Sequence, residues 1–191
     1  MFPSSGPQVG KDVQSCSGAG HFQTIFFGQT KRVYKVGVMN VKLRTEEARR
    51  YVLDAVDKEL EVCVVIDSGL RKAGNVAMEQ IVEREGFRWI GKERRGERSQ
   101  IGGIGFIVRR GWEVERLGWE GDTGGWIRIS NDSDSMVIGG IYRAPSMNLR
   151  ESLGGMREMI MRYREEMVVV VGDFNCRIGK LGNRVVVGDW R

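Results

Sequence analysis

Polar side chains follow three apolar segments of this sequence at the points where those segments end. Asn40 follows Val-Gly-Val-Met, Asp67 follows Val-Val-Ile, and Asp173 and Asn175 follow a valine-rich run that closes on glycine. Carboxylate and carboxamide oxygens suit Mg²⁺, which also keeps waters and takes substrate phosphates. In open α/β sheets, ligands gather at the carboxyl ends of strands. These residues therefore predict a metal and phosphate site, although Asp and Asn at strand ends also simply begin turns.

The elements that must position these residues are short buried strands and amphipathic helices. β-branched, mostly apolar segments predict strands at 33–41 and 61–66, and apolar residues at helical spacing predict a helix over 46–60 with Thr45 as its N-cap. This order implies a crossover connection and an α/β layer. A second helix is expected over 149–166. Further strands are expected at 87–90, 103–108, 126–130, 136–142 and 167–171.

Buried strands with interspersed helices predict an α/β (α+β) fold, a two-layer β-sandwich flanked by helices. A doubly wound parallel sheet is the competing architecture, but it would need a more regular alternation of strand and helix. Residues 1–30 are rich in Ser, Gly and Gln and lack periodicity, so they are expected to form a flexible leader. The remaining residues, 31–191, are expected to form a single domain.

Composition favours a polyanionic partner and an intracellular location. The formal net charge is +5 and the sequence pI is about 9.3, which favours nucleic acid through its phosphates. Cys16, Cys63 and Cys176 are widely spaced and odd in number, so they do not predict a disulfide framework. No apolar run approaches the ~18 residues of a membrane span. We expect a soluble intracellular protein, nuclear if it acts on DNA, with no membrane partner.

Five segments between Val36 and Gly179 carry a set of motifs in a fixed order. They are VGVMNVKLR, VVIDSGL, GGIGFIV, IYRAPS and VGDFNCRIG. Together they resemble the endonuclease/exonuclease/phosphatase superfamily, the DNase I-like phosphodiesterases. The motif GIGFIV followed by the motif GDFNxxIG is most similar to the endonuclease domains of non-LTR retrotransposons and their domesticated relatives. The resemblance implies a DNase I-like sandwich and Mg²⁺-dependent (or Mn²⁺-dependent) hydrolysis of phosphodiesters, with DNA as the expected substrate.

The resemblance also implies a role for each candidate residue. Asn40 would lie in the metal and phosphate site, and Asp67 would take the place of the family's metal-binding glutamate. Tyr142 would hydrogen-bond the scissile phosphate. Asp173 would orient or activate the attacking water, and Asn175 would support the phosphate and transition-state oxygens. The implied chemistry is in-line displacement in which a metal polarises the phosphoryl oxygen.

The sequence departs from the family pattern in ways that predict weak or absent nuclease activity. The family's terminal Ser-Asp-His element has no counterpart here, and the only histidine, His21, lies upstream of every motif. We therefore expect residues 31–191 to be a partial domain, incomplete at the C-terminus. Asp67 is one methylene shorter than glutamate, and Lys42 occupies a position that is acidic in some relatives. Loss of a positioned acid–base group typically costs 10²–10⁴-fold in rate.

Two alternatives to a DNA endonuclease stay open at the level of sequence. One is a phosphoesterase of the same superfamily that acts on a phosphoinositide or another small phosphoester. The other is a non-catalytic remnant that binds nucleic acid or protein through the retained surface. The sequence does not indicate cleavage specificity, oligomeric state or protein partners.

Overall fold

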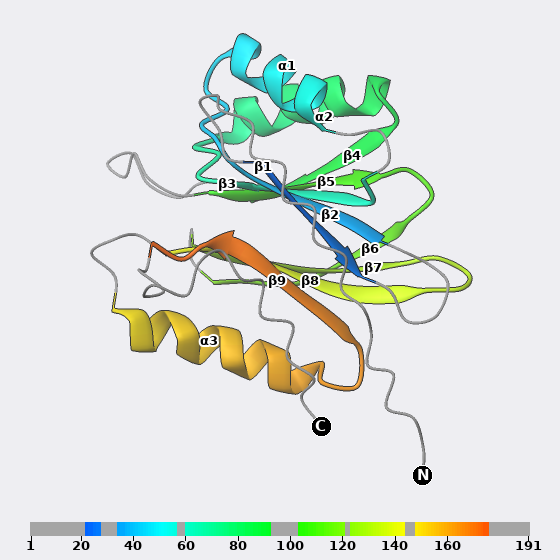
Figure 1. The fold of residues 1–191 in the computed structure, drawn as a ribbon. Coiled ribbons are helices and arrows are strands. Elements are labelled where there is room, and N and C mark those ends of the chain that lie inside the picture. Colours follow the sequence, from blue (N-terminus) through cyan, green and yellow to red (C-terminus); the bar gives the residue numbers. More distant parts are fainter. Residues whose placement is uncertain are drawn as a thin grey trace.

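Two stacked β-sheets with helices on both outer faces form the body of the molecule (Figure 1). Helices α1 (Glu46–Ala55) and α2 (Lys72–Arg84) lie on one side of the stack, and α3 (Leu149–Arg162) lies on the other. The computed structural model describes residues 22–27, 34–56, 60–92, 103–120, 123–143 and 148–175. The predicted α/β sandwich flanked by helices is confirmed, and the doubly wound parallel sheet is excluded for these residues.

The first sheet has strand order β1-β2-β3-β5-β4. β2 and β3 run parallel and are joined through α1, whereas the other neighbouring strands run antiparallel. The crossover predicted from the strand–helix–strand pattern is therefore present. The strands are β1 (Phe22–Phe27), β2 (Tyr34–Asn40), β3 (Val62–Ile66), β4 (Phe87–Gly91) and β5 (Ile104–Arg109).

The second sheet has strand order β6-β7-β8-β9. Its first three strands form an antiparallel meander, and β9 runs parallel to β8 after the crossover through α3. Each sheet therefore holds one parallel pair, with both carboxyl ends of the pair at one edge. The strands are β6 (Glu113–Glu120), β7 (Gly124–Ser130), β8 (Ser135–Tyr142) and β9 (Met167–Asp173).

Apolar side chains fill the space between the sheets and the space beneath the helices. The cluster between the sheets includes Val64, Phe106 and Ile138, all fully buried. Gly140 on β8 permits close approach here, because a Cβ at this position would lie 2.7 Å from Val64 Cγ1 and 2.9 Å from Ile104 Cγ2. Separate clusters lie under α1 with α2 and under α3. The alternation of inward and outward residues along each strand thus supplies a four-layer packing.

Helix α1 is shorter than predicted, because it ends at Ala55 instead of residue 60. Thr45 is its N-cap as expected, with Oγ1 accepting a hydrogen bond from Ala48 N at 3.1 Å. Val56 adopts an extended conformation and Leu60 is fully buried ahead of β3. Their apolar side chains continue the helical spacing, but they enter the core from connecting backbone.

The structure differs from the predicted flexible leader at residues 22–27, which form β1. This strand pairs antiparallel with β2, from Phe22 opposite Met39 to Phe27 opposite Tyr34. The physical reason is the free edge of β2, whose backbone groups would otherwise have no partner in the sheet. Residues 1–21 lie outside the described part of the chain, so the boundary between leader and domain stays a prediction.

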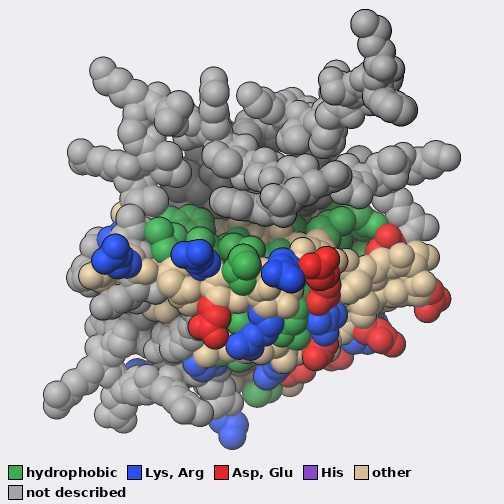
Figure 2. Space-filling view, turned by 90° about the horizontal axis from the view of Figure 1, so that it is seen from below, with side chains coloured by type: hydrophobic (Ala, Val, Ile, Leu, Met, Phe, Trp, Pro, Cys, Tyr) green, Lys and Arg blue, Asp and Glu red, His purple; other side chains and the backbone are tan. Residues whose placement is uncertain are grey.

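The face that carries α3 mixes both signs of charge around partly exposed apolar side chains (Figure 2). Met161 is 54% exposed there. Arg162 pairs with Glu158 at 3.4 Å and Arg164 pairs with Glu165 at 3.1 Å, all on the surface. Such exposed pairs contribute little to stability. Among the described residues, no helix has the length and apolar character needed to cross a bilayer.

Candidate active site

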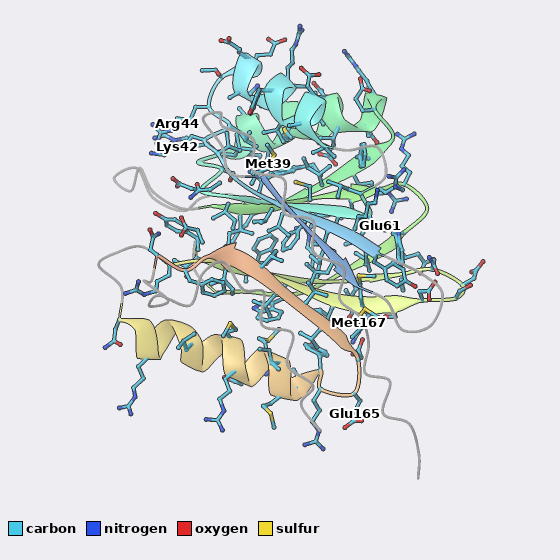
Figure 3. The ribbon with its side chains drawn as sticks, viewed as in Figure 1. Met39, Lys42, Arg44, Glu61, Glu165 and Met167 are labelled. Atoms are coloured by element: carbon cyan, nitrogen blue, oxygen red, sulfur yellow. The ribbon has the colours of Figure 1, made fainter. Side chains whose placement is uncertain are left out.

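The strand ends that carry the candidate residues meet at one side of the sandwich. Glu61 precedes β3 and Met167 begins β9, and both lie on one side of the molecule in Figure 3. Lys42 and Arg44, which follow β2, lie on the opposite side, toward which β9 runs. The two parallel strand pairs therefore end at the same side, as the sequence prediction of one shared site requires.

A side-chain hydrogen bond joins the two sheets at this point. Asn40 is the last residue of β2, and Asp173 is the last residue of β9. Asn40 Nδ2 donates to Asp173 Oδ2 at 2.7 Å, although the residues are 133 positions apart in sequence. An ionised acceptor makes this bond stronger than one between neutral groups. The bond brings two of the five predicted site residues into direct contact.

Asp67 follows β3 in the left-handed region, with φ 55, and is 8% exposed. Backbone hydrogen bonds fix the segment around it, from Leu43 N to Ser68 O at 2.9 Å and from Ser68 N to Gly103 O at 3.0 Å. Gly103 has φ 98, and a Cβ there would lie 2.8 Å from Ser68 Oγ. Glycine is therefore needed for close approach of β5 to the Asp67 segment, in agreement with a packing role for it.

The Asp173 carboxylate has both oxygens engaged. Oδ2 accepts from Asn40, and Oδ1 accepts from the backbone N of Asn175 at 3.0 Å. The second bond is the turn-forming contact that Asp makes at strand ends. Asp173 is therefore both a turn former and a carboxylate that faces the first sheet. A turn-forming role for Asp173 and a role in the candidate site are compatible.

Tyr142 ends β8 directly beside Asp173 in the strand register and is 7% exposed. The pKa of its phenol is raised, first because burial disfavours the phenolate and second because Asp67 and Asp173 lie close enough to repel its charge. The hydroxyl is therefore protonated at neutral pH and able to donate a hydrogen bond. Both carboxylates therefore act electrostatically on the same phenol.

Arg143 holds the loop after β9 and is a residue that the sequence analysis did not single out. Its Nη1 donates to Phe174 O at 3.2 Å and to Asn175 O at 2.8 Å, and its backbone N donates to Asp173 O at 2.8 Å. Asn175 Nδ2 donates back to Arg143 O at 2.8 Å. Asn175 has φ 42, so these bonds stabilise a backbone conformation uncommon for non-glycine residues. The sequence signal that could have identified Arg143 is its position directly after Tyr142 in the motif IYRAPS.

The donor set at this site fits a divalent cation of the Mg²⁺ type. Asp67 and Asp173 both raise the pKa of Tyr142, and the Asn40 amide donates a hydrogen bond to Asp173. No group of three or more His, Cys, Asp or Glu side chains that could hold a metal occurs in the described part of the chain. Mg²⁺ is usually held by one or two carboxylates together with waters and phosphates, so two carboxylates and an amide suffice.

Other residues singled out in the sequence lie outside the described residues. These are His21, Cys16, Cys176 and the strand-like segment 184–187. Cys63 is fully buried on β3, and burial raises the pKa of its thiol to about 12, so it has no nucleophilic role at neutral pH.

Several solved structures resemble this chain in fold, although no family model and no curated protein sequence matches it. The endonuclease domain of TRAS1, a telomere-specific non-LTR retrotransposon, superposes with a TM-score of 0.57 at 12% identity over 76% of this chain and 62% of that chain. The 3′ phosphatase NExo from Neisseria, bound to product DNA hairpin, has a TM-score of 0.53 at 10% identity over 75% and 59%. The AP endonuclease LMAP from Leishmania major has a TM-score of 0.53 at 16% identity over 73% and 54%.

The aligned part of this chain thus spans between 54% and 62% of the length of these three relatives. These three similar structures are a retrotransposon endonuclease domain, an AP endonuclease and a phosphatase. The described residues share the DNase I-like fold of these three structures.

Proposed function

We propose that this chain is a divalent-metal-dependent phosphodiesterase that acts on DNA as an endonuclease. The observation that carries the proposal is the hydrogen bond between Asn40 Nδ2 and Asp173 Oδ2 at 2.7 Å. It unites polar residues from the ends of two different sheets, where Tyr142 also lies. A purely structural role for these residues would not require them to meet across the sandwich.

Asp173 is the group proposed to orient the attacking water and to accept its proton. Its two oxygens are fixed by Asn40 and by the backbone N of Asn175, so the carboxylate is held in one orientation. A positioned base of this kind contributes typically 10²–10⁴-fold to rate.

Tyr142 and Asn175 are proposed to contact the phosphate. The raised pKa of Tyr142 keeps its proton available for a hydrogen bond to a phosphate oxygen. Asn175 donates one amide hydrogen to Arg143 O in this structure. A carboxamide nitrogen carries two hydrogens, so the second can reach a phosphate while the first keeps the loop in place.

Asp67 and Asn40 would hold the metal, with Mg²⁺ or Mn²⁺ as the proposed ion. When bound there, it would supply charge stabilisation for the phosphoryl oxygens and the leaving group. Asp67 is 12% exposed in its side chain, so its carboxylate is largely removed from competing water. The shorter aspartate in place of glutamate is expected to reduce the rate, because a misplacement of ~1 Å can cost ~100-fold.

DNA is proposed as substrate from charge and from the neighbours in fold. The chain carries a formal net charge of +5, which favours a polyanion. Of the similar structures, the NExo phosphatase is bound to a DNA hairpin. ANGEL2, at a TM-score of 0.52 and 12% identity, is a 2′,3′-cyclic phosphatase in complex with adenosine-2′,3′-vanadate, so a phosphatase reaction stays the alternative. A nuclear location follows only if DNA is the substrate.

Nicking is proposed to be slow for the 191-residue chain, because its one histidine, His21, precedes all the motifs. The test is conversion of supercoiled plasmid to nicked circles with Mg²⁺ or Mn²⁺, with EDTA as control. The proposal predicts slow nicking that is lost in EDTA and in Asp173→Ala. Robust nicking that Asp173→Ala abolishes would contradict the expected weakness while supporting the assigned site.

The same assay separates the two alternatives. A substrate panel with a 2′,3′-cyclic nucleotide and a soluble phosphoinositide headgroup would reveal a small-phosphoester activity if these substrates are cleaved in preference to plasmid. DNA binding that persists in EDTA and in Asp173→Ala, without any nicking, would support a non-catalytic binding module. Nicking that is unchanged in Asp173→Ala would overturn the proposed function.

A further inference from the structure

A lysine lies beside the carboxylate that is proposed to hold the metal. Lys42 Nζ is 3.9 Å from Asp67 Oδ2, with the two side chains 50% and 12% exposed. Lys42 follows Asn40 by two residues, and Asn40, Lys42 and Asp67 line the same surface depression. In Figure 3, Lys42 projects from the side of the molecule at which the site lies. The ammonium thus approaches the largely buried Asp67 carboxylate from solvent.

We propose that Lys42 is a built-in counter-ion of the metal site, which competes with the divalent cation for Asp67 and weakens its binding. This inference rests on the proposed function, because it takes Asp67 as a metal ligand. It concerns a residue of this chain that the proposed reaction does not use. It also assigns a consequence to Lys42 that a solvated surface lysine would not have.

The physical basis is Coulomb repulsion between a single and a double positive charge. An Mg²⁺ ion on Asp67 would lie about 2 Å from the carboxylate oxygen. An ammonium 3.9 Å from that oxygen is therefore within a few ångströms of the ion unless it moves away. Even at the dielectric constant of water, a +2 and a +1 charge about 5 Å apart repel by an amount equivalent to roughly tenfold in affinity.

The exposure of Lys42 sets the size of the effect. A half-exposed lysine on a flexible stem can swing into solvent when a metal enters, so the repulsion is partly relieved. An ion pair at 3.9 Å whose lysine is half exposed contributes little stability, so the lysine can leave Asp67 at small cost. We therefore expect about a tenfold change in metal affinity instead of the far larger change that a buried charge would produce.

The experiment measures Mn²⁺ binding to the full chain without nucleic acid, by the EPR signal of free Mn²⁺. Wild type is compared with Lys42→Met, which keeps the aliphatic stem, and with Lys42→Arg, which keeps the charge. Arg157→Met on the exposed face of α3 is the control, because it removes one positive charge away from the site. We expect Lys42→Met to lower the dissociation constant about tenfold, and Lys42→Arg and Arg157→Met to resemble wild type.

Thermal denaturation gives a second readout that needs no activity. Because stabilisation of the folded state by a ligand grows with the ratio of its free concentration to its dissociation constant, the same Mn²⁺ concentration should raise the melting temperature of Lys42→Met more than that of wild type. Equal Mn²⁺ affinity in wild type and Lys42→Met, or an equal gain in Arg157→Met, would overturn the counter-ion proposal. The first of these results is also what a lysine that serves only to contact phosphate would give.

Asp67→Asn distinguishes failure of this inference from failure of the proposed function. If Asp67→Asn abolishes Mn²⁺ binding while Lys42→Met matches wild type, the counter-ion proposal falls and the metal site stands. If no Mn²⁺ binding that depends on Asp67 occurs in wild type or in Lys42→Met, both the inference and the proposed metal dependence fall.

Discussion

The two halves of the candidate site are built in different ways. The half on the second sheet, with Asp173 and Asn175, is fixed by side-chain hydrogen bonds in which Arg143 takes part from both its guanidinium and its backbone. The half on the first sheet, with Asp67, is positioned by backbone hydrogen bonds between neighbouring loops. Its side-chain carboxylate forms an ion pair with Lys42, in which Nζ and Oδ2 are 3.9 Å apart.

The difference suggests a division between a preorganised half and an adjustable half. Groups that orient a water or a phosphate gain rate from a fixed geometry, because reorganisation then costs nothing during the reaction. A metal site completed by waters and substrate can tolerate a ligand that shifts on binding. The bond between Asn40 and Asp173 is where the two halves meet. The following variants test this comparison, from the largest expected effect to the smallest.

Asp173→Ala removes the carboxylate on which both halves converge. We expect the nicking rate to fall by about 10²–10⁴-fold, because the proposed base and the partner of Asn40 are lost together. The measurement is the initial rate on supercoiled plasmid, with melting temperature as a check on folding. Asp132→Ala is the control, because Asp132 is exposed in the turn between β7 and β8. A similar loss in both variants would contradict the assignment.

Arg143→Met should damage the preorganised half while leaving the chain folded. The carbonyls of Phe174 and Asn175 lose their charged donor, which we expect to cost about 1–3 kcal/mol in the free energy of unfolding. The nicking rate should fall by up to ~100-fold, since the loop that carries Asn175 would shift. Arg157→Met is the matched control on α3. An unchanged rate would mean that the loop needs no support from Arg143.

Gly140→Ala tests the close contact that holds the halves together across the sandwich. The added Cβ would meet Val64 and Ile104, so we expect a loss of about 1–3 kcal/mol in the free energy of unfolding. Gly154→Ala is the matched control, because a Cβ at Gly154 meets nothing within 4 Å on helix α3. It should stabilise the helix by up to about 1 kcal/mol. Urea denaturation of both variants would reveal equal shifts if the sheets do not approach closely at Gly140.

Glu166→Gln should have the smallest effect of these variants. The effect should be a change in how the free energy of unfolding depends on pH. The Arg128 guanidinium binds Glu166 through two hydrogen bonds, of 2.9 and 2.8 Å, and lowers the pKa of that carboxyl. This stabilisation is therefore present above the ordinary pKa of 4.5 and is lost as pH falls through the lower folded value. Urea midpoints of wild type and Glu166→Gln should differ near neutral pH and converge as the pH falls below the lowered folded-state pKa of Glu166. A difference in urea midpoint that stays the same at all these pH values would contradict a stabilising ion pair between Arg128 and Glu166.

The strand ends of the site could be predicted from sequence because their physical signals are local. Runs such as Met167–Val171 are too apolar to lie outside a core, and a polar residue directly after such a run must lie at its end. Asn40, Asp67 and Asp173 were therefore placed correctly at the ends of strands. That Asn40 and Asp173 touch across two sheets could not be read from periodicity, which carries no information on contacts 133 residues apart.

The missed elements lacked such signals. β6 is rich in charged residues and has a register shift between Arg116 and Gly118, so its alternation is broken. The N-cap of α2, Arg71, makes no side-chain capping hydrogen bond, and the helix buries only Met78 and Val82, which leaves little amphipathic pattern. β1 forms by pairing with β2, and the pairing is a property of the partner strand as much as of its own sequence. Arg143 acts through backbone carbonyls, which sequence does not display.

The ionisation of Tyr142 tests most directly whether Asp67 and Asp173, from different sheets, share one site. Its pKa can be followed by NMR of labelled tyrosine, with Tyr142→Phe to assign the signal. Because both carboxylates contribute to the raised pKa, Asp67→Asn and Asp173→Asn should each lower it, and the double variant should lower it further. It should remain above 10.0, since burial is the largest cause. A Tyr142 pKa that neither variant changes would contradict the convergence of the two halves.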